Sequence, residues 1–481
     1  MVVNSISFLI FFLVIFLIYY FPLKEKTKEQ NVLLLLASYV FYGIADWKMI
    51  PLLLLATGVF YGLGILIGKS NETTPRKASL WTTLGVCLGV GLLVYFKYFN
   101  FFITSFSDLF ASMGLKTNWS TFNIILPLGI SFFTFKLISY VIEVHRQHIE
   151  PTTDIAVFAT YVAFFPTIMA GPIDRPNAFI PQLQSKRAFK YDLAVDGCRQ
   201  ILWGMFKKMV VADNCATAVN TIWTGYQGES GSQLLLVAVL FAFQIYADFS
   251  GYSDMAIGVG KILGFRITKN FNYPFFGRNI AEYWRNWHIS LTSWLTDYVF
   301  MPLNIKFRDI GKWGPILAII ITFVLIGLWH GANWTFAVFG LYHGLLYIPL
   351  MLSGSFFKKS KLKTNRYGLP TLGDASKMLL TFLLVTFGLI IFRAENIAQA
   401  WDYLCRMFSS SLFTFPDRGR SPIVYIIILL AVEWFQRDKQ HALQIENVVK
   451  YRIIRWSIYS LIVLYTITNA GDQAEFIYFQ F

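Results

Sequence analysis

Long apolar runs recur along this chain of 481 residues, and they constrain its fold more than any other feature. Such a run predicts a membrane-spanning helix, because backbone hydrogen bonds must be satisfied within the protein where there is no water. Some runs are short, so we expect an all-α, polytopic membrane protein with about eleven transmembrane helices plus re-entrant or interfacial helices. The apolar windows lie at residues 5–22, 31–45, 50–68, 79–96, 124–142, 154–170, 232–249, 314–330, 334–353, 376–392, 422–435 and 455–470.

Composition and charge support the same interpretation. Hydrophobic residues make up 56% of the chain and charged residues 14%, with a mean hydropathy of +0.53. The net charge of +14 raises the question of nucleic acid, but the basic residues gather in short segments between apolar runs, as at 24–28 and 358–363. That arrangement is typical of cytoplasmic loops and suits anionic lipid headgroups. We therefore expect a multi-pass protein of the cytoplasmic (inner) membrane that contacts lipid and binds no nucleic acid.

The first basic loops predict a sidedness. Segments 24–28 and 69–77 flank an apolar hairpin, so both are expected in the cytoplasm and the N-terminal run is expected to begin outside. The run 5–20 lacks a preceding basic region and a following A-x-A site, so we expect a retained first span rather than a signal peptide. We find no internal repeat and no boundary that would release a soluble domain. A single membrane domain over 1–481 is therefore expected.

Two histidines stand in a window that is free of charge. Between residues 313 and 357 there is no Asp, Glu, Lys or Arg, yet His330 (in "IGLWHGANW", 326–334) and His343 lie inside it. A neutral imidazole in a low-dielectric site can accept a proton, as a general base near pH 7 must. A lone buried histidine is nevertheless more often a hydrogen-bonded packing residue, and position alone does not decide. For His343, which hydropathy places deepest, packing is favoured over catalysis.

A third histidine, His288, lies in "EYWRNWHISLTSWLTDY" (282–298), together with Arg285 and Trp287. The segment has two interpretations. One is an interfacial amphipathic helix with an aromatic belt. The other is a second polar group lining the cavity that His330 faces.

The segment "YADFSGYSDMA" (246–256) follows an apolar run and holds Asp248 and Ser250. Its carboxylates are too few for a calcium loop, and no G-x-S-x-G elbow surrounds the serine. The four cysteines of the chain lack CxxC spacing, so apolar packing is favoured over a zinc site or a disulfide framework. We expect no metal and no tightly bound cofactor.

At these residues the chain resembles the membrane-bound O-acyltransferases. It is most similar to the bacterial branch that contains the alginate O-acetylation and teichoic-acid D-alanylation membrane subunits. The match extends over nearly the whole chain, and its order and extent make it specific. It includes "LPLGISFFTFKLISYVIEV" (126–144), "FFPTIMAGPIDRP" (164–176), "YADFSGYSDMAIG" (246–258), "NFNYPFFGRNIAEYWRNWHISLTSWLTDYVFMPL" (270–303), "GLWHGANWTF" (327–336), "FRAENIAQAW" (392–401) and "FIYFQF" (476–481). Lys136 departs from the pattern, where family members often carry glutamine, and it is expected to snorkel or to pair with an acid.

The resemblance implies a fold and two catalytic residues. The family passes acyl groups from a cytoplasmic thioester to a hydroxyl through a tunnel in a helical membrane domain, here with a catalytic core of about 124–353. The signature Trp-His-Gly context is matched by His330, which would take or orient the proton of the acceptor hydroxyl. The Trp-Arg-x-Trp-His segment is matched by His288, which would position donor or acceptor. The candidates for lining the tunnel are Trp329, Asn333, Trp287, Arg285, Asp248 and Ser250.

Within the family, segments 392–401 and 476–481 favour the alginate-acetylation-like branch. The resemblance then implies acetyl-CoA as the donor and O-acetylation of an extracytoplasmic polysaccharide, completed by a separate esterase-like transferase with a serine nucleophile. Two alternatives stay open. One is a D-alanyl or longer-chain acyltransferase of the same fold, whose donor would be a carrier-protein thioester or a lipidic acyl-CoA. The other is a transporter or polysaccharide exporter with an intramembrane proton pathway, which should show internal repeats.

Overall fold

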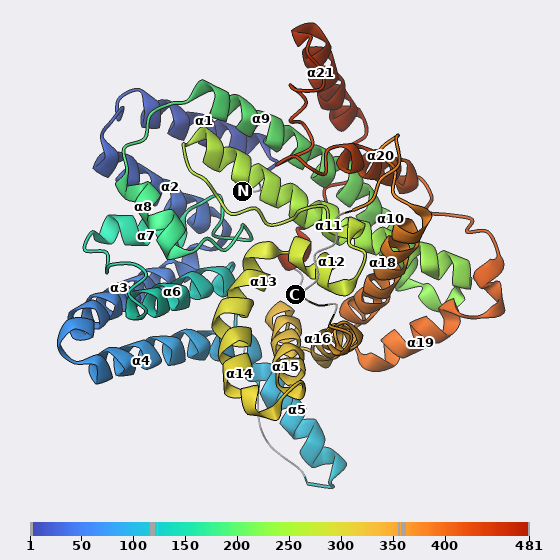
Figure 1. The fold of residues 1–481 in the computed structure, drawn as a ribbon, viewed down its shortest axis with the longest axis horizontal. Coiled ribbons are helices and arrows are strands. Elements are labelled where there is room, and N and C mark those ends of the chain that lie inside the picture. The colour runs from blue at the N-terminus through green and yellow to red at the C-terminus, as the bar shows by residue number, and fades with distance from the viewer. Residues whose placement is uncertain (1–2, 116–120, 123, 355, 357–361, 480–481) are drawn as a thin grey trace. The chain divides into compact units, whose positions relative to one another are not determined.

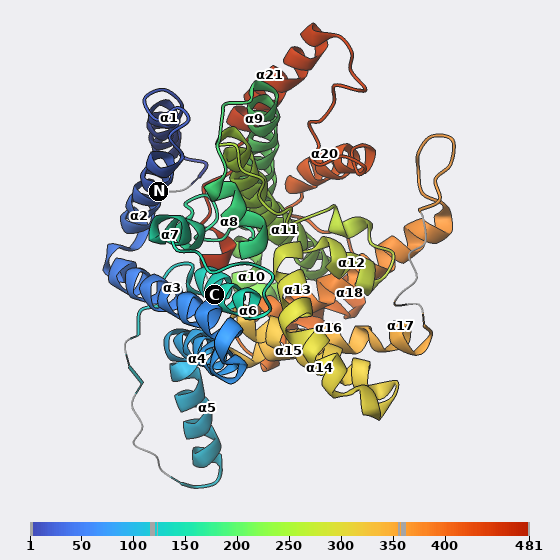
Figure 2. The same ribbon diagram turned by 60° about the vertical axis from the view of Figure 1, so that its left-hand side comes forward.

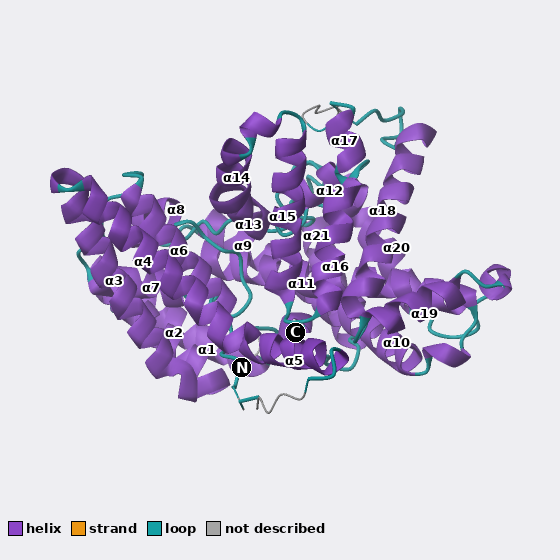
Figure 3. Ribbon diagram, turned by 90° about the horizontal axis from the view of Figure 1, so that it is seen from below, coloured by secondary structure: helices purple, strands orange, loops and turns teal. Residues whose placement is uncertain are grey.

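The computed structural model describes residues 3–115, 121–122, 124–354, 356 and 362–479. Within these ranges every secondary-structure element is a helix, apart from one isolated β-bridge between Thr364 and Pro370 (Figure 3). The prediction of an all-α protein is confirmed. Most of the basic cluster at 358–363 and the last two residues of "FIYFQF" lie outside the described residues.

The chain divides into two compact units. The first consists of residues 1–198 and 256–268, and the second of residues 199–255 and 269–481. The prediction of a single domain over 1–481 stays a prediction, and each unit is described by itself.

The first unit is built from apolar helices of the N-terminal part of the chain, drawn in blue and blue-green in Figure 1. Its π-helical turn η2 joins α4 to α5 without a loop, and the short 3₁₀ turn η1 joins α2 to α3. The elements are α1 (Ile6–Tyr20), α2 (Thr27–Asp46), η1 (Trp47–Met49), α3 (Ile50–Thr73), α4 (Pro75–Leu93), η2 (Val94–Tyr98), α5 (Phe99–Ser112), α6 (Ile130–His145), α7 (Ile155–Ala163), α8 (Pro176–Gln184), the first half of α9 (Tyr191–Met205) and the end of α11 (Gly231–Ile262).

Lys136 of α6 does not snorkel, and its charge interacts with the buried carboxylate of Asp174. It is 1% exposed, and its Nζ donates to the carbonyl oxygen of Tyr161 at 3.2 Å and to Oγ1 of Thr167 at 3.1 Å. The physical reason is the last turn of α7 and the turn that follows it, where the carbonyl group of Tyr161 and the hydroxyl group of Thr167 reach the amine inside the unit. Sequence alone could not show these partners.

The second unit contains His288, His330 and His343. Short helices and 3₁₀ or π-helical turns alternate here with long apolar helices, and α12 to α16 follow one another along the chain (Figure 2). The elements are η3 (Phe206–Ala212), α10 (Asp213–Thr224), η4 (Tyr226–Gly228), α11 (Gly231–Ile262), η5 (Pro274–Phe276), α12 (Ile280–Asn286), α13 (Ile289–Leu295), η6 (Thr296–Phe300), α14 (Met301–Lys306), η7 (Arg308–Ile310), α15 (Trp313–His330), α16 (Trp334–Leu346), α17 (Ile348–Leu352), α18 (Leu372–Arg393), α19 (Ile397–Met407), η8 (Ser410–Phe413), α20 (Pro422–Phe435), α21 (Arg452–Thr468) and η9 (Ile477–Phe479).

Six helical stretches are long and apolar enough to cross a membrane. Shorter apolar helices, α1 and α20, add to them, and the count of about eleven spans stays a prediction. In α11 the most apolar window is 83% buried, which makes α11 an internal helix of the protein rather than a lipid-facing one. The six stretches are Thr27–Thr73, Pro75–Ser112, Gly231–Ile262, Trp313–His330, Trp334–Leu352 and Leu372–Arg393.

Glycines allow α15 and α16 to pack backbone against backbone. A Cβ on Gly327 would lie 2.0 Å from the carbonyl oxygen of Phe336, and one on Gly340 would lie 2.2 Å from that of Phe323. Small residues of this kind are the usual device by which membrane helices approach closely. The sharp turn between the two helices follows from Gly331, whose backbone is extended, and from Asn333, whose side chain accepts the amide N–H of Thr335 and so caps α16.

Candidate active site

His330 is the last residue of α15, as the apolar window and the glycine after it predicted. Its side chain points into the second unit and the residue is only 6% exposed. Aromatic rings surround it: Trp329 at 5.0 Å between ring centroids, Phe392 of α18 at 5.0 Å and Tyr478 of η9 at 5.6 Å. The imidazole therefore sits among aromatic rings contributed by α15, α18 and η9.

His288 connects α12 to α13 and is fully buried. Its backbone is left-handed, with φ 45° and ψ 52°, a conformation that costs energy for a residue with a Cβ. The turn directs the imidazole towards Asn270, whose Oδ1 lies 3.1 Å from Nδ1 of His288. Such a strained turn at a buried polar residue is a feature of functional sites.

The hydrogen bonds around Asn270 fix the tautomer of His288. The side-chain atom that faces Nδ1 also accepts the amide N–H of Ser290 at 3.3 Å and its Oγ–H at 2.9 Å. A backbone N–H can only donate, so this atom is the amide oxygen, and Nδ1 of His288 must carry the hydrogen. Nε2 then holds the lone pair, and it is buried without a hydrogen-bond partner among the described residues.

Burial also sets the charge of His288. It lowers the pKa of His288 to about 3, because the charged imidazolium would lose its hydration. The ring is therefore neutral at physiological pH and presents one free acceptor, Nε2. This is the chemistry of a group that receives a hydrogen bond or a proton from a bound hydroxyl.

The structure brings His288, Trp329 and His330 together. The centroid of the Trp329 ring lies 5.4 Å from that of His288 and 5.0 Å from that of His330. Tyr478 contacts the same group from another direction, with its centroid 6.3 Å from that of His288. The two histidines that the sequence singled out therefore share two aromatic neighbours. Their catalytic roles stay a prediction.

His343 lies apart from this cluster. Its Nδ1 accepts the indole N–H of Trp284 at 3.2 Å, and its ring packs edge-on against Phe339 at 4.6 Å. It is fully buried, as hydropathy predicted, although His288 is buried to the same extent. These contacts are those of a packing residue.

Two of the candidate tunnel residues occupy structural positions. Asn333 caps α16 and donates through Nδ2 to the carbonyl oxygen of Glu395 at 2.8 Å. Trp287 packs among aromatic rings, including Tyr283 at 5.4 Å between centroids. Ser250 of α11 is 1% exposed, and its Oγ has no hydrogen-bond partner among the described residues.

Asp248 of α11 forms a buried ion pair. Its Oδ1 is 2.8 Å from Nζ of Lys208, and its Oδ2 accepts the amide N–H of Ile477 at 2.8 Å. Because both oxygens are engaged by groups of the protein, Asp248 serves to hold another segment in place.

Arg285 lies where two cavities of the second unit meet. One cavity, of about 350 Å³, runs between α12, α13 and α15 and is lined by Arg285, Thr322 and Ile326 among others. The other, of about 370 Å³, is polar and is lined by Arg285, Arg278 and Arg437 among others. Ile326 precedes His330 by one helical turn, so the first cavity lies along the helix that carries this histidine.

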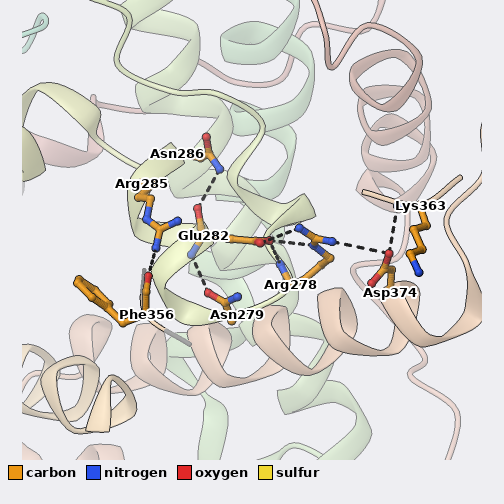
Figure 4. Close-up of polar contacts among 8 residues, drawn as sticks. All are labelled: Arg278, Asn279, Glu282, Arg285, Asn286, Phe356, Lys363 and Asp374. Carbon is orange, nitrogen blue, oxygen red and sulfur yellow. Dashed lines mark hydrogen bonds and ion pairs between the residues drawn. The ribbon is translucent and has the colours of Figure 1, made fainter. Parts of the chain in front are cut away.

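A network of polar contacts orders the end of α12 next to these cavities (Figure 4). Glu282 accepts from the guanidinium of Arg278 at 2.8 Å, and Arg278 also lies 3.8 Å from a carboxylate oxygen of Asp374 at the start of α18. Arg285 points the other way and donates to the carbonyl oxygen of Phe356 at 2.7 Å. The charge of Arg278 is thus compensated by two acids, whereas Arg285 is held by a neutral carbonyl group.

Two residues of the cluster were not identified from the sequence. Asn270 and Tyr478 both lie in segments that carry the family resemblance, but a single asparagine or tyrosine has no spacing that marks it as part of a site. Only the contacts with His288 and His330 reveal them.

Comparison with known proteins identifies the family. The model of the membrane-bound O-acyltransferase family matches residues 144–384, which include both histidines of the cluster. The chain belongs to the membrane-bound O-acyltransferase family. It is 38% identical over 425 residues to the protein named probable alginate O-acetylase of Pseudomonas aeruginosa, covering 88% of this chain and 77% of the relative.

Other relatives of this O-acyltransferase have names that refer to other polymers. It is 30% identical over 437 residues to the peptidoglycan O-acetyltransferase of Helicobacter pylori, covering 83% of this chain and 78% of the relative. It is 31% identical over 285 residues to the teichoic acid D-alanyltransferase of Bacillus subtilis, covering 57% of this chain and 70% of the relative. Family and relatives together make the protein an acyltransferase with several membrane-spanning helices, in the branch that the sequence resemblance indicated.

Proposed function

We propose that this protein is an O-acetyltransferase of the cytoplasmic membrane. It takes an acetyl group from cytoplasmic acetyl-CoA and passes it across the membrane for the O-acetylation of an extracytoplasmic polysaccharide. The observation that carries the proposal is the buried cluster of His288, Trp329 and His330. It lies in a chain whose relatives over more than four fifths of its length are named for O-acetylation. The match to the D-alanyltransferase is shorter, which makes D-alanyl transfer the second candidate.

The reaction requires one proton transfer and one exchange of bonds. The acceptor oxygen attacks the thioester carbonyl, a C–O bond forms, the C–S bond breaks, and the thiol leaves with the proton that the hydroxyl loses. In this proposal His330 receives the proton from the hydroxyl and returns it to the sulfur. A thioester is reactive, so a positioned base, proximity and exclusion of water supply the rate acceleration.

His288 has a positioning role in this proposal. Its Nε2 accepts a hydrogen bond from the acceptor hydroxyl and so aims the oxygen at the carbonyl carbon. The hydrogen bond between Nδ1 and Asn270 supports this role, because it keeps the lone pair on the nitrogen that is free.

The polar cavity beside Arg285 supports a donor that carries phosphate. Arg285 and Arg437 are both held by backbone carbonyl groups, those of Phe356 and Trp434, so neither charge is compensated by that partner. Asp438 lines the same cavity. Guanidinium groups bind phosphate oxygens in two-pronged hydrogen bonds, which a thioester of CoA would use. The neighbouring cavity between α12, α13 and α15 is mostly apolar, and it suits the uncharged arm of CoA that carries the thioester.

The acceptor side completes the proposal. The transferred group leaves towards an extracytoplasmic glycan, either directly or through a separate serine-esterase-like acetyltransferase. About eleven spans and a tunnel between the two faces of the membrane are part of the same proposal, since donor and acceptor lie on opposite sides.

The test uses inside-out membrane vesicles that contain the protein. Acetyl-CoA labelled in the acetyl group is added outside, and polymannuronate oligosaccharides or peptidoglycan fragments are enclosed as acceptors, with and without a co-expressed serine-esterase-like partner. We expect label in the enclosed polymer, and a loss of at least about 100-fold for His330→Gln, because a positioned general base contributes that much or more. The variant should insert in the membrane in normal amount.

Matched arms separate the alternatives. Labelled D-alanyl carrier-protein thioester replaces acetyl-CoA in one arm, and labelling of the polymer in that arm alone would favour D-alanyl transfer. His343→Gln is the control for loss of a buried histidine, and it should retain transfer. Wild-type transfer by His330→Gln at equal expression would contradict the assignment.

A further inference from the structure

The segment 471–478 belongs to the second unit, and its three polar residues, Asp472, Gln473 and Glu475, are exposed. Phe476 and Ile477 are buried, and the segment becomes helical only at η9. Its backbone hydrogen bonds therefore go to other parts of the unit. The amide N–H of Ile477 donates to Asp248 at 2.8 Å, and that of Gly471 donates to the carbonyl oxygen of Met209 at 2.9 Å.

A buried group of three charges holds this segment. Nζ of Lys208 lies 2.8 Å from Asp248 and 3.0 Å from Asp213, and all three side chains are at most 4% exposed. Lys208 also donates to the carbonyl oxygen of Ala474 at 3.1 Å, while Asp213 accepts the amide N–H of Ala474 at 3.4 Å. We call Lys208, Asp213 and Asp248 the anchor.

Stability alone is a weak reason for the anchor. Buried ion pairs lose their hydration, and apolar residues of similar size often stabilise a protein equally well. What the anchor adds is direction, because carboxylate and ammonium groups offer hydrogen bonds in fixed positions to one particular stretch of backbone. The segment is thereby held in one register.

That register places Tyr478 at the histidine cluster. The Tyr478 ring centroid lies 5.6 Å from that of His330 and 4.4 Å from that of Phe249 of α11. Trp329, Phe339 and Phe392 also face His330, and they are held by α15, α16 and α18. Tyr478 is the wall that comes from the anchored segment.

We propose that Tyr478 determines the size of the acyl group that the site accepts, and that the anchor acts as its positioning device. The proposal rests on the function proposed above. Rings at these separations are in van der Waals contact, so an acyl chain that extends past His330 must displace one of the four rings around it. Removing the Tyr478 ring opens room without altering a helix or a histidine.

Specificity for the acyl group is the measurement. For Tyr478→Ala in inside-out vesicles, we expect the ratio of kcat/KM for butyryl-CoA to that for acetyl-CoA to rise by about 10-fold or more, since a pocket discriminates one methylene by about 10- to 200-fold. Tyr478→Phe keeps the ring and should keep the ratio. Phe243→Leu is the matched control for the loss of a buried ring, because Phe243 of α11 packs on Phe275 and Phe382 rather than on Tyr478 or the histidines.

The anchor is tested by hydrogen exchange in the double variant Lys208→Met, Asp248→Asn, which removes two of its three charges and keeps an amide oxygen for Ile477. The amides of Ala474 and Ile477 should exchange at least about 10-fold faster, while those of α18 should not change, and the acyl ratio should rise as in Tyr478→Ala. Unchanged exchange would overturn the role of the anchor.

The outcomes for the two proposals are distinct. A wild-type protein that transfers acetyl, with an unchanged ratio in Tyr478→Ala, overturns this inference alone. A ratio that rises equally in Phe243→Leu also overturns it, because the loss of any buried ring would then suffice. A wild-type protein that transfers no acyl group from any CoA thioester overturns both proposals.

Discussion

His288 illustrates how single neighbours decide what a histidine can do. Its sequence context admits an interfacial residue or a cavity-lining one, and both readings fit the same tryptophans. The structure resolves the ambiguity through Asn270, which fixes the proton on Nδ1, and through complete burial, which keeps the ring neutral. His343 is buried to the same extent, but it uses Nδ1 to accept from Trp284, which leaves it a packing role.

Asn270→Asp should give the enzyme a new dependence on pH. A carboxylate beside Nδ1 stabilises the imidazolium, so the pKa of His288 rises from about 3 towards or above the ordinary value near 6.5. A histidine with a raised pKa is protonated as pH falls through that value, and protonated Nε2 can no longer accept a hydrogen bond. We therefore expect kcat of the variant to fall at least about 10-fold between about pH 8 and pH 5, measured with acetyl-CoA.

The comparison that controls for this effect is the wild-type protein over the same pH range. There His288 is neutral throughout, so it contributes no loss of rate on the acidic side. Asn365→Asp, in an exposed loop, controls for the added charge. Parallel profiles for Asn270→Asp and wild type would show that Asn270 does not govern the proton of His288.

Among the elements, the helices that apolar periodicity marks could be predicted, and the pairing between them could not. The end of α15 at His330 follows from a charge-free window and a glycine, both visible in the sequence. The approach of His288 to Trp329 could not be predicted, because it depends on a left-handed turn, which is uncommon for any residue other than glycine. The segment 471–478 was missed for a related reason: its hydrogen bonds go to distant side chains, and such a stretch has no period.

The close packing of α15 on α16 leads to a prediction at this scale. Gly340→Ala should place a methyl group 2.2 Å from the carbonyl oxygen of Phe323, so the two helices must separate. Overpacking of this kind costs about 1–3 kcal/mol, and it shifts the end of α15 that carries His330. We expect a lower Tm in detergent together with reduced acetyl transfer. Gly373→Ala in α18 meets no atom within 4 Å and should change neither, and an unaltered Tm for Gly340→Ala would contradict the role of this contact.

At the scale of the whole molecule, the number of crossings decides on which side each loop lies. The stretch Thr27–Thr73 has 47 residues, and a straight helix of that length would measure about 70 Å, more than twice the hydrocarbon core of a bilayer. The backbone leaves the helical conformation at Asp46 (φ −155°, ψ 76°), just before the 3₁₀ turn Trp47–Met49. The stretch therefore has its break near the middle, as two separate spans require.

Cysteine labelling can test this crossing pattern. In a variant whose native cysteines Cys87, Cys198, Cys215 and Cys405 are replaced by serine, the exposed residues Lys26, Lys48 and Lys77 are changed one at a time to cysteine. Basic loops stay in the cytoplasm, so a membrane-impermeant maleimide should label Lys48→Cys in intact cells, and Lys26→Cys and Lys77→Cys only after the membrane is opened. The cysteine-free parent measures background. Equal labelling of Lys26→Cys and Lys48→Cys in intact cells would mean that α2 does not cross the membrane, and the donor and acceptor sides would have to be reassigned from this point of the chain onwards.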